Sequence, residues 1–529
     1  MKRRNKFYNV LLLTLTVMAS GGCDDFLDTM PDNRAQVDSE QKIQSILTSA
    51  YIDHECLTVA ELISDNADDY GENNPYTERW YDDTFAWKDE TEDANESLDS
   101  FWQTAFKSIA SANQALQAID DLGGATTASL KECKAEALLC RAYNHFMLAC
   151  MFCKHYSSTA ATDLGLPYIE HPETELNPQY ERGTLAELYE KIDRDLQEAL
   201  PMVGDSYYTV PKYHFNTKAA YAFACRFYLY YEKWEEALKY ANLCLGSQAN
   251  TMLRNWKGMA TMTQTFDAIC NEYVDAGSNA NLLLLTAYSS AGLVFGPYPV
   301  GCRYNHGGYL AQYEDMRASN IWGGSNDFYL TPKVYSGTNL DKTIFWKIPY
   351  MFEYTDLVAG IGYRRTAYPA FTTDECLLNR AEAYILLKRY DEAAADLTTW
   401  MQNITRSTRV LTPEYITTFY NSKEYAYSDE TGLNSTIKKH LNPSFTIDAE
   451  GSTQEAMLQC MLGFRRIETM HAGLRWFDIK RYGIEIPRRL MNAAGNPERK
   501  TDFLSKDDKR RVLQIPLKVR SAGFEANPR

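Results

Sequence analysis

Two segments far apart in the chain repeat one spacing of small and aromatic residues. They are Cys225, Tyr228, Trp234 and Ala237 and, 156 positions later, Ala381, Tyr384, Tyr390 and Ala393. Small, aromatic, aromatic, small at intervals of 3, 6 and 3 is the pattern of a tetratricopeptide helix hairpin. The small residues let two helices approach closely, and the rings fill the space between hairpins. Because two such units do not make a regular solenoid, the pattern predicts hairpins within a larger helical domain.

Helical periodicity marks three further segments. Apolar residues recur on one face over Phe101–Asp120, and a longer helical run covers residues 128–154. Thr184–Val203 starts with the capping-box pair Thr184 and Glu187. We therefore expect a mainly α fold, an α-α superhelix with tetratricopeptide-like helix hairpins.

Three segments lack the helical period. Residues 64–98 are acidic and aromatic, residues 404–453 are polar, and residues 271–370 are rich in Gly, Tyr and Asn, with strand-like pieces such as Asn281–Leu285. Long loops in a compact domain are functional or disordered, and the aromatic content favours ordered and functional ones. We expect a loop-rich, partly β ligand-binding segment at about 271–370 and a helical scaffold that covers about 35–270 and 371–529.

The first residues follow the order of a bacterial lipoprotein signal. Basic residues between Lys2 and Lys6 precede an apolar run over Val10–Val17, and small residues then lead to Cys23. The run is too short to span a bilayer, and no later window offers about 20 apolar residues. We expect a signal peptide at residues 1–22 and lipidation of Cys23 as a membrane anchor. The alternative is a plain signal peptide with an incidental cysteine.

Charge and cysteine content exclude some classes of protein. Acidic residues outnumber basic ones by 70 to 54, and the net charge is −16; such a chain repels phosphate backbones, so we expect no nucleic-acid partner. Twelve cysteines are present, and without Cys23 an odd number remains, which does not indicate a disulfide framework. Cys150 and Cys153 form a CxxC inside a helical run. We interpret them as core residues, with zinc or redox chemistry as the alternative.

Several motifs match one family of proteins. Cys23 to Asp28 followed by Pro31 looks like a mature lipoprotein N-terminus with an acidic surface-export signal. The run Asn379–Tyr384 resembles an RAEAY helix, and Arg465–Glu468 with Gly473–Arg481 resembles an R..E…EG.RW.DL.R signature, although Ala472 stands where a Glu is usual. On these residues the chain resembles the SusD/RagB family of outer-membrane nutrient-binding lipoproteins.

The resemblance implies one SusD-like domain over residues 23–529. It implies a surface-exposed lipoprotein of the cell outer membrane that captures oligosaccharides and delivers them to a SusC-like TonB-dependent transporter, without catalysis. Within the signature, Asp478 lies three residues from both Arg475 and Arg481, so the three side chains fall near one another on a helix. We expect them to form an internal charge network that fixes the helix.

Motifs of known chemistry are absent from the sequence. There is no nucleophile elbow, zinc-protease motif or phosphate loop. The oxygen-rich run Asp65–Gly71 lacks EF-hand spacing, so we expect no cofactor and no metal, with a weak Ca²⁺ site there as the alternative. The two carboxylates of a glycosidase cannot be picked out among 70 acidic residues, so a surface glycoside hydrolase stays an alternative to a binding protein.

Sugar binding needs flat aromatic faces for the C–H face of a pyranose and polar groups for its hydroxyls. Relatives in the family take their ligand-binding aromatics from loops near residues 64–98 and 271–370, and both segments here contain such groups. The expected ligand-binding residues are Trp80, Tyr81, Trp87, Asn66 and Asp68 in the first segment, and Tyr304, Trp322, Asn326 and Tyr329 in the second, where Tyr298 is a further aromatic residue. For each ring, core packing is the competing role.

Two further functions stay open at this stage. The first is a RagB-like lipoprotein that captures peptides, which acidic loops would select for positive charge. The second is a tetratricopeptide adaptor that binds only protein, for which the aromatic loops would be dispensable.

Overall fold

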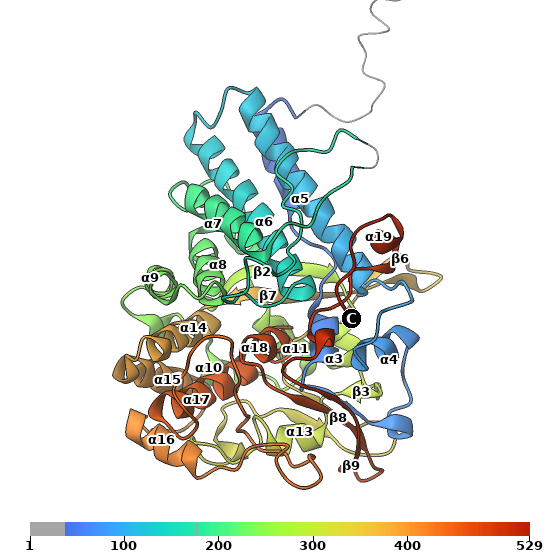
Figure 1. Cartoon of the computed structure of the whole chain (residues 1–529), viewed down its shortest axis with the longest axis vertical. Helices are drawn as coiled ribbons and strands as arrows, with labels where there is room; N and C mark the ends of the chain where they lie inside the picture. Colours follow the sequence, from blue (N-terminus) through green and yellow to red (C-terminus); the bar gives the residue numbers. More distant parts are fainter. Residues whose placement is uncertain (1–36, 176–177) are drawn as a thin grey trace, which may run out of the picture.

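The computed structural model describes residues 37–175 and 178–529, so the expected signal peptide and Cys23 lie outside the described residues. Helices make up most of the regular structure, and small sheets make up the rest (Figure 1). The expected mainly α fold is confirmed. In the described ranges, no helix combines the length and the apolar character needed to cross a membrane.

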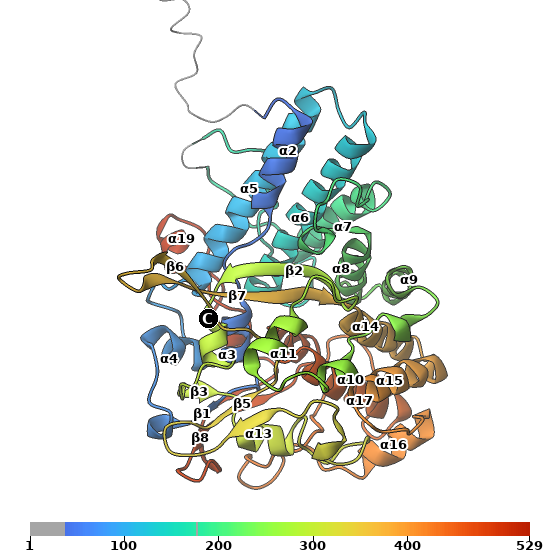
Figure 2. The same cartoon turned by 180° about the vertical axis from the view of Figure 1, so that it is seen from behind.

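One end of the molecule is a group of packed helices (Figures 1 and 2). They are α2 (Glu40–Leu47), α5 (Leu98–Asp121), α6 (Ala128–Phe152) and α7 (Leu185–Ala199). Helix α6 packs against the other three. The expected capping box opens α7: Glu187 N donates to the Thr184 hydroxyl, and Thr184 N donates to the Glu187 carboxylate.

The repeated small–aromatic pattern forms two helix hairpins. The first consists of α8 (Thr217–Tyr230) and α9 (Trp234–Leu245), and the second of α14 (Thr373–Leu386) and α15 (Tyr390–Ile404). Helix α9 packs against α14, so the two hairpins are neighbours in space although 156 residues separate them in the chain. The helix hairpins are confirmed, and their assignment as tetratricopeptide units stays a prediction.

The two hairpin turns share one backbone conformation. Each has a residue in the left-handed region at the same place in the repeat, Glu232 with φ 60° and Lys388 with φ 58°. The next N–H then donates back across the helix end, as in a Schellman cap. These bonds are Lys233 N to Tyr228 O at 2.9 Å and Arg389 N to Tyr384 O at 2.8 Å.

Shorter helices complete the scaffold. Helix α17 (Thr453–Glu468) packs against α14, α15 and α16 (Pro413–Asn421), and α18 (Arg475–Arg481) packs against α3 (Leu57–Ile63). The remaining ones are α4 (Arg79–Phe85), α10 (Trp256–Met259), α11 (Phe266–Tyr273), α12 (Ala291–Val294), α13 (Gly308–Tyr313) and α19 (Leu517–Ser521).

In the described part of the chain, three small sheets lie among the helices (Figure 2). The first has the order β2-β7-β6 and is antiparallel, with β2 (Asn281–Tyr288), β7 (Ile361–Thr372) and β6 (Met351–Asp356). The second has the order β3-β1-β8-β9, with β3 (Tyr304–Asn305), β1 (Asp68–Asp69), β8 (Ile486–Met491) and β9 (Pro497–Leu504). The third pairs β4 (Lys333–Tyr335) with β5 (Lys342–Ile344). Because β1 pairs with both β3 and β8, the second sheet joins three distant parts of the chain.

The β8–β9 hairpin lies in the segment 371–529, which we expected to be helical. Strand β9 is exposed and polar along most of its length, and β8 buries two arginines. An alternation of apolar and polar residues is the sequence sign of a half-buried strand, and neither strand has it. The strand-like stretch expected at Asn281–Leu285 is confirmed as part of β2.

A network of buried ion pairs, here called the arginine network, connects the helices to the loops. Its cations are Arg465, Arg466, Arg475, Arg481 and Arg489, and its anions are Asp65, Asp68, Glu314, Glu382 and Asp478; each of these side chains is at most 4% exposed. The internal charge network expected around α18 is confirmed, but one pairing differs. Asp478 lies 3.7 Å from the expected Arg481 but accepts from Arg465 at 2.9 and 2.5 Å, while Arg475 reaches Asp65 through two bonds of 2.8 Å.

Removing one anion from this network tests its contribution to stability. In Glu382→Gln, Arg465 and Arg481 lose their shared carboxylate. Breaking a buried pair on one side costs about 3–5 kcal/mol, so we expect a clear fall in the midpoint of guanidinium unfolding. The control is Asp448→Asn, which removes an exposed partner of Lys388. Equal midpoints for the two variants would contradict the buried role of Glu382.

Stability is expected to be greatest at mildly acidic pH. Burial alone would raise the pKa of Glu382, but Arg465 and Arg481 lower it to about 2 in the folded protein. The stabilisation from this carboxylate is therefore complete above the unfolded pKa of about 4.3 and is lost as the pH falls from about 4.3 toward 2. Burial raises the pKa values of Glu61 and Glu96 to about 7, so their contribution is complete at low pH and is lost as the pH rises from about 4.3 to 7. Unfolding midpoints measured from pH 2 to 8 should peak near pH 4–5, and Glu96→Gln should flatten the decline above pH 5. A midpoint that keeps rising to pH 8 would refute this.

Candidate functional site

The structure buries most of the aromatic residues that the sequence pointed to. Trp80, Tyr81, Trp87, Tyr304 and Trp322 are between 1% and 5% exposed. Neighbouring groups cover the rings: the Arg488 guanidinium lies 3.9 Å from the centre of the Trp87 ring, and Phe85 stacks on Tyr304 at 4.2 Å. A covered ring offers no face to a sugar, so the expected open platform does not form from these five residues in this structure.

The expected polar ligands are divided between core and surface. Asn66 and Asp68 are buried, where Asn66 accepts from Arg466 and Asp68 pairs with Arg489. Asn326 is exposed, and Tyr329 is half-buried beneath the Arg406 guanidinium at 5.4 Å. Asn326 and Tyr329 are therefore the two expected side chains that solvent reaches, and their role as ligand contacts stays a prediction.

The carboxylates of the oxygen-rich run are bound by arginines. Asp65 pairs with Arg475, Asp68 with Arg489, and Asp69 with Arg303 at 2.8 Å. A Ca²⁺ ion needs several free oxygen ligands, and these carboxylates already accept from guanidinium groups. Across residues 37–175 and 178–529, no cluster of three or more His, Cys, Asp or Glu side chains is arranged to hold a metal ion.

The eleven cysteines of the described ranges are all buried and unpaired, including Cys150 and Cys153. The carbonyl oxygens of these two residues accept from Lys480 Nζ at 2.7 and 2.6 Å. The CxxC therefore lies in the core, as expected.

The two aromatic segments run side by side at Tyr76. Tyr76 N donates to Gly301 O, and Arg303 N donates to Tyr76 O at 2.8 Å, so the loop after β1 runs beside the chain that leads into β3. The Tyr76 hydroxyl donates to Glu78 Oε1 at 2.5 Å, and Trp80 Nε1 donates to the other oxygen at 2.9 Å. These bonds fix the position of Tyr76 at the surface.

A group of partly exposed rings surrounds this meeting point and is here called the aromatic cluster: Tyr76, Tyr298, Tyr350, Phe352 and Tyr354. Tyr298 is 41% exposed and Tyr354 is 55% exposed. The rings of Tyr298 and Tyr350 lie 4.6 Å apart, and those of Phe352 and Tyr354 lie 4.8 Å apart. Because side chains alternate along a strand, Tyr350, Phe352 and Tyr354 point to the same face.

Arg364 on β7 supplies the charge of the aromatic cluster. It is the cross-strand partner of Phe352, and its guanidinium donates to the Ser290 hydroxyl at 3.3 Å. Burial raises the pKa of Tyr76 to about 12, the hydrogen bond to Glu78 adds to this rise, and Arg364 opposes it. Burial also raises the pKa of Tyr350, again opposed by Arg364. The guanidinium thus lies beside both rings.

The sequence interpretation named Tyr298 but did not find the rest of the aromatic cluster. The signal that could have revealed it is the alternation of Tyr350, Phe352 and Tyr354 with the residues between them. That alternation predicts a strand with an aromatic face. Within 271–370 the sequence interpretation names Asn281–Leu285 as strand-like and makes no use of this alternation.

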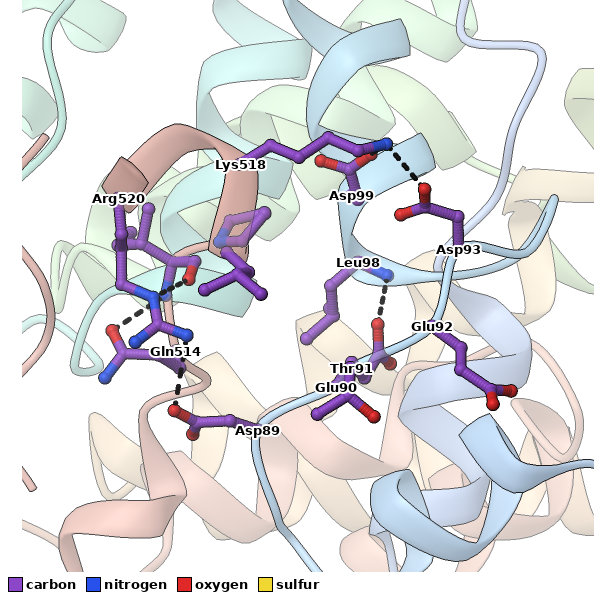
Figure 3. Close-up of a pocket in the computed structure, with 13 residues that line it drawn as sticks. Asp89, Glu90, Thr91, Glu92, Asp93, Leu98, Asp99, Gln514, Lys518 and Arg520 are labelled. Carbon is purple, nitrogen blue, oxygen red and sulfur yellow. Dashed lines mark hydrogen bonds and ion pairs between the residues drawn. The ribbon is translucent and has the colours of Figure 1, made fainter. Parts of the chain in front are cut away.

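A pocket of about 150 Å³ lies between residues 89–99 and the C-terminal segment (Figure 3). Five of its lining residues are acidic, but basic residues of the C-terminal segment neutralise most of them: Lys518 reaches Asp93 at 2.6 Å and Asp99 at 3.1 Å, and Arg520 reaches Asp89 at 3.4 Å. Of the other two, Glu92 pairs with Arg79 at 3.6 Å, and burial raises the pKa of Glu90 to about 7. These ion pairs connect the C-terminal segment to the acidic residues 89–99.

A second cavity, of about 240 Å³ and with an aromatic lining, lies between α5 and the C-terminal segment. Trp102, Phe106, Tyr180 and Phe524 line it. Trp102 is 7% exposed and packs against Phe524 with ring centres 5.7 Å apart, whereas Tyr180 is 39% exposed. Tyr180 is thus an exposed tyrosine of similar accessibility away from the aromatic cluster.

Comparison with protein families agrees with this architecture. Residues 25–229 match a family model described as starch-binding associating with outer membrane, and residues 250–517 match the model of the SusD family. The second match alone covers just over half of the sequence, so the chain belongs to the SusD family. The resemblance found in the sequence is thereby confirmed. No curated protein matches the sequence.

Solved structures share the fold over nearly the whole chain. A putative sugar binding protein from Bacteroides vulgatus ATCC 8482 is 17% identical, with a TM-score of 0.64 over 93% of this chain and 99% of that chain. A SusD superfamily protein from Bacteroides thetaiotaomicron VPI-5482 is 18% identical, with a TM-score of 0.56 over 93% and 100% of the two chains. A SusD superfamily protein from Bacteroides vulgatus ATCC 8482 is 17% identical, with a TM-score of 0.59 over 92% and 97%.

Strands β6 and β7 approach closely at Gly362, so a substitution there tests how this hairpin holds the aromatic cluster in place. A Cβ at this position would lie 2.0 Å from Glu353 O and 2.8 Å from the Phe352 ring, so Gly362→Ala must push the hairpin strands apart. We expect a loss of stability of about 1–3 kcal/mol and faster amide hydrogen exchange over residues 351–365. Gly337→Ala is the control, because nothing lies within 4 Å of its added Cβ. Unchanged exchange in Gly362→Ala would contradict the packing described.

Proposed function

We propose that this SusD-family protein is a cell-surface lipoprotein that captures oligosaccharides and delivers them to a SusC-like TonB-dependent transporter in the outer membrane. The observation that carries the proposal is the aromatic cluster around Arg364, on a chain that belongs to the SusD family. The description of the family model for residues 25–229 and the name of the similar sugar binding protein support a carbohydrate as the ligand.

The aromatic cluster has both groups that a sugar requires. The exposed faces of Tyr298 and Tyr354 can cover the apolar face of a pyranose, and Arg364 and the tyrosine hydroxyls can hydrogen-bond its hydroxyl groups. Tyr354 is held by the β6–β7 hairpin, Tyr298 packs on Tyr350, and Tyr76 is held by its bond to Glu78, so little side-chain freedom would be lost when a ligand binds. We take the protein's contribution to be capture, without cleavage of the glycan.

Attachment and delivery complete the proposal. A lipid on Cys23 would hold the protein at the membrane, since each buried CH₂ group contributes about 0.8 kcal/mol. The capture site would then stay close to the transporter, and a bound oligosaccharide would have a short distance to travel.

Affinity electrophoresis through gels that contain single polysaccharides, starch among them, tests the capture step. The protein used is residues 24–529, and a reducing-sugar assay follows each run. We expect one glycan to retard the protein without new reducing ends. Tyr298→Ala with Tyr354→Ala should weaken retardation about tenfold or more, since 1.4 kcal/mol corresponds to a factor of ten. Tyr180 lies outside the aromatic cluster and is about as exposed as Tyr298, so Tyr180→Ala should be retarded as strongly as the unmodified chain.

Three other outcomes would indicate a different binding site or a different function. If Tyr180→Ala loses retardation and the double variant keeps it, the ligand binds in the cavity between α5 and the C-terminal segment. If reducing ends appear, the protein is a glycoside hydrolase. If every glycan fails and basic peptides bind with strong salt dependence, the captured nutrient is a peptide.

A further inference from the structure

A cavity far larger than those described above lies at the end of α6. Its volume is about 550 Å³. Residues 154–159, the loop 442–444, the C-terminal end of α18 and residues 506–512 line it. It shares no residue with the aromatic cluster or with the pocket in Figure 3.

The cavity is positively charged in a protein whose net charge is −16. Its lining includes the cations Lys154, Lys480, Lys506, Lys509 and Arg511, against two anions, Asp507 and Asp508. Both anions are engaged beside the cavity, Asp507 by Lys506 at 2.6 Å and Asp508 by Arg510 at 2.8 Å. Among the cations, Lys154 pairs with Asp163 at 2.6 Å, and Lys509 donates to Arg529 O at 3.1 Å. The lining therefore carries an excess of positive charge.

Two of these cations are buried without a carboxylate partner. Lys480 is 4% exposed and Arg511 is 7% exposed. In the described part of the chain, neither has an acidic group within ion-pair distance; Lys480 donates to the carbonyl oxygens of Cys150 and Cys153, and Arg511 to carbonyl oxygens such as Ile479 O at 3.1 Å. An ammonium group has three donors, so Lys480 has one beyond those two bonds.

The electrostatics of the lining favour the binding of an anion. Burial lowers the pKa of Lys480 to about 8, and Arg511 lowers it further while the Cys150 and Cys153 thiols oppose the change. Burial lowers the pKa of His155 to about 3, and Lys480 and Arg511 add to this fall. A buried charge is costly unless it is paired, and a bound anion would supply the absent partner.

The other lining groups suit a polyhydroxylated ligand. Ser158, Thr159 and Ser444 supply hydroxyl groups and Asn442 supplies an amide, while Pro443 and Pro528 supply apolar surface. Thr159 also donates to Asp163 at 2.6 Å, and the Ser444 hydroxyl bonds His155 Nε2 at 2.9 Å. A volume of about 550 Å³ exceeds what an inorganic anion needs. The combination of positive charge, hydroxyl groups and apolar patches fits a sugar that carries a carboxylate.

We propose that this cavity is a second ligand site, which binds an acidic sugar residue of the uronate class with its carboxylate toward Lys480. The rim cations Lys154 and Lys509 contribute attraction at longer range. The inference rests on the proposed capture of glycans for its ligand class, and it adds that the captured glycans include uronates.

Calorimetric titration of residues 24–529 with glucuronate, glucose and sulfate tests this site. We expect saturable binding of glucuronate, with glucose at least tenfold weaker. Lys480→Met should weaken glucuronate binding at least tenfold. Because this buried change can also disturb the fold, the exposed double variant Lys154→Gln with Lys509→Gln gives an independent measurement, with an expected weakening of about threefold to tenfold and a smaller salt dependence. Lys500→Gln, an exposed lysine outside the cavity, is the matched control.

The two proposed sites separate in the same experiments. Tyr298→Ala with Tyr354→Ala should leave glucuronate binding unchanged, and the exposed double variant Lys154→Gln with Lys509→Gln should leave retardation by a neutral glycan unchanged. Equal binding of glucuronate and glucose, or no effect of the rim variant, would overturn the proposal. If sulfate binds and glucuronate does not, the cavity takes inorganic oxyanions only and the assignment to sugars is wrong.

Discussion

The arginine network is the constraint on which the rest of the molecule depends. Arg466 donates to the Asp65 carbonyl across 401 positions of sequence and to the Glu314 carboxylate at 2.8 Å. Arg489 similarly joins β8 to Asp68 and lies 3.5 Å from Glu314. Buried ions cost several kcal/mol each unless every partner is in place. The network therefore favours only the arrangement in which the early loop, the middle segment and the C-terminal helices meet.

The aromatic cluster follows from that arrangement. Asp68 and Asp69 are held by Arg489 and Arg303, so β1 pairs with β3, and the chain after β1 runs beside residues 301–303. Tyr76 thereby reaches the face of the β6–β7 hairpin that carries Phe352 and Arg364. A surface assembled from loops thus inherits the rigidity of a buried ion-pair network, which limits the ordering cost of binding.

Much of the scaffold could be predicted from the sequence because its causes are local. The α7 capping box and the two hairpins depend on residues a few positions apart, and so did the expectation of a charge network near Asp478. The identity of each partner could not be predicted, since Asp65 reaches Arg475 only through the tertiary fold. Aromatic composition also failed to separate core from surface: Trp80 and Trp322 lie in the two segments expected to bind ligand, yet both are 2% exposed. The strand alternation at Tyr350, Phe352 and Tyr354 was the more informative signal, because it specifies a face.

The carboxylates near the aromatic cluster favour binding over hydrolysis. A glycosidase needs one carboxyl group that can give up a proton and a second that is free to act as base or nucleophile at the scissile bond. Both oxygens of Glu78 accept hydrogen bonds, from Tyr76 and Trp80, and Asp82 accepts from the Tyr304 hydroxyl at 2.7 Å. Glu353, on the opposite face of the β6–β7 hairpin, pairs with Arg365. Glu78, Asp82 and Glu353 thus already bond the protein's own side chains, and in the proposed capture of a glycan the ring faces and Arg364 would contact the ligand.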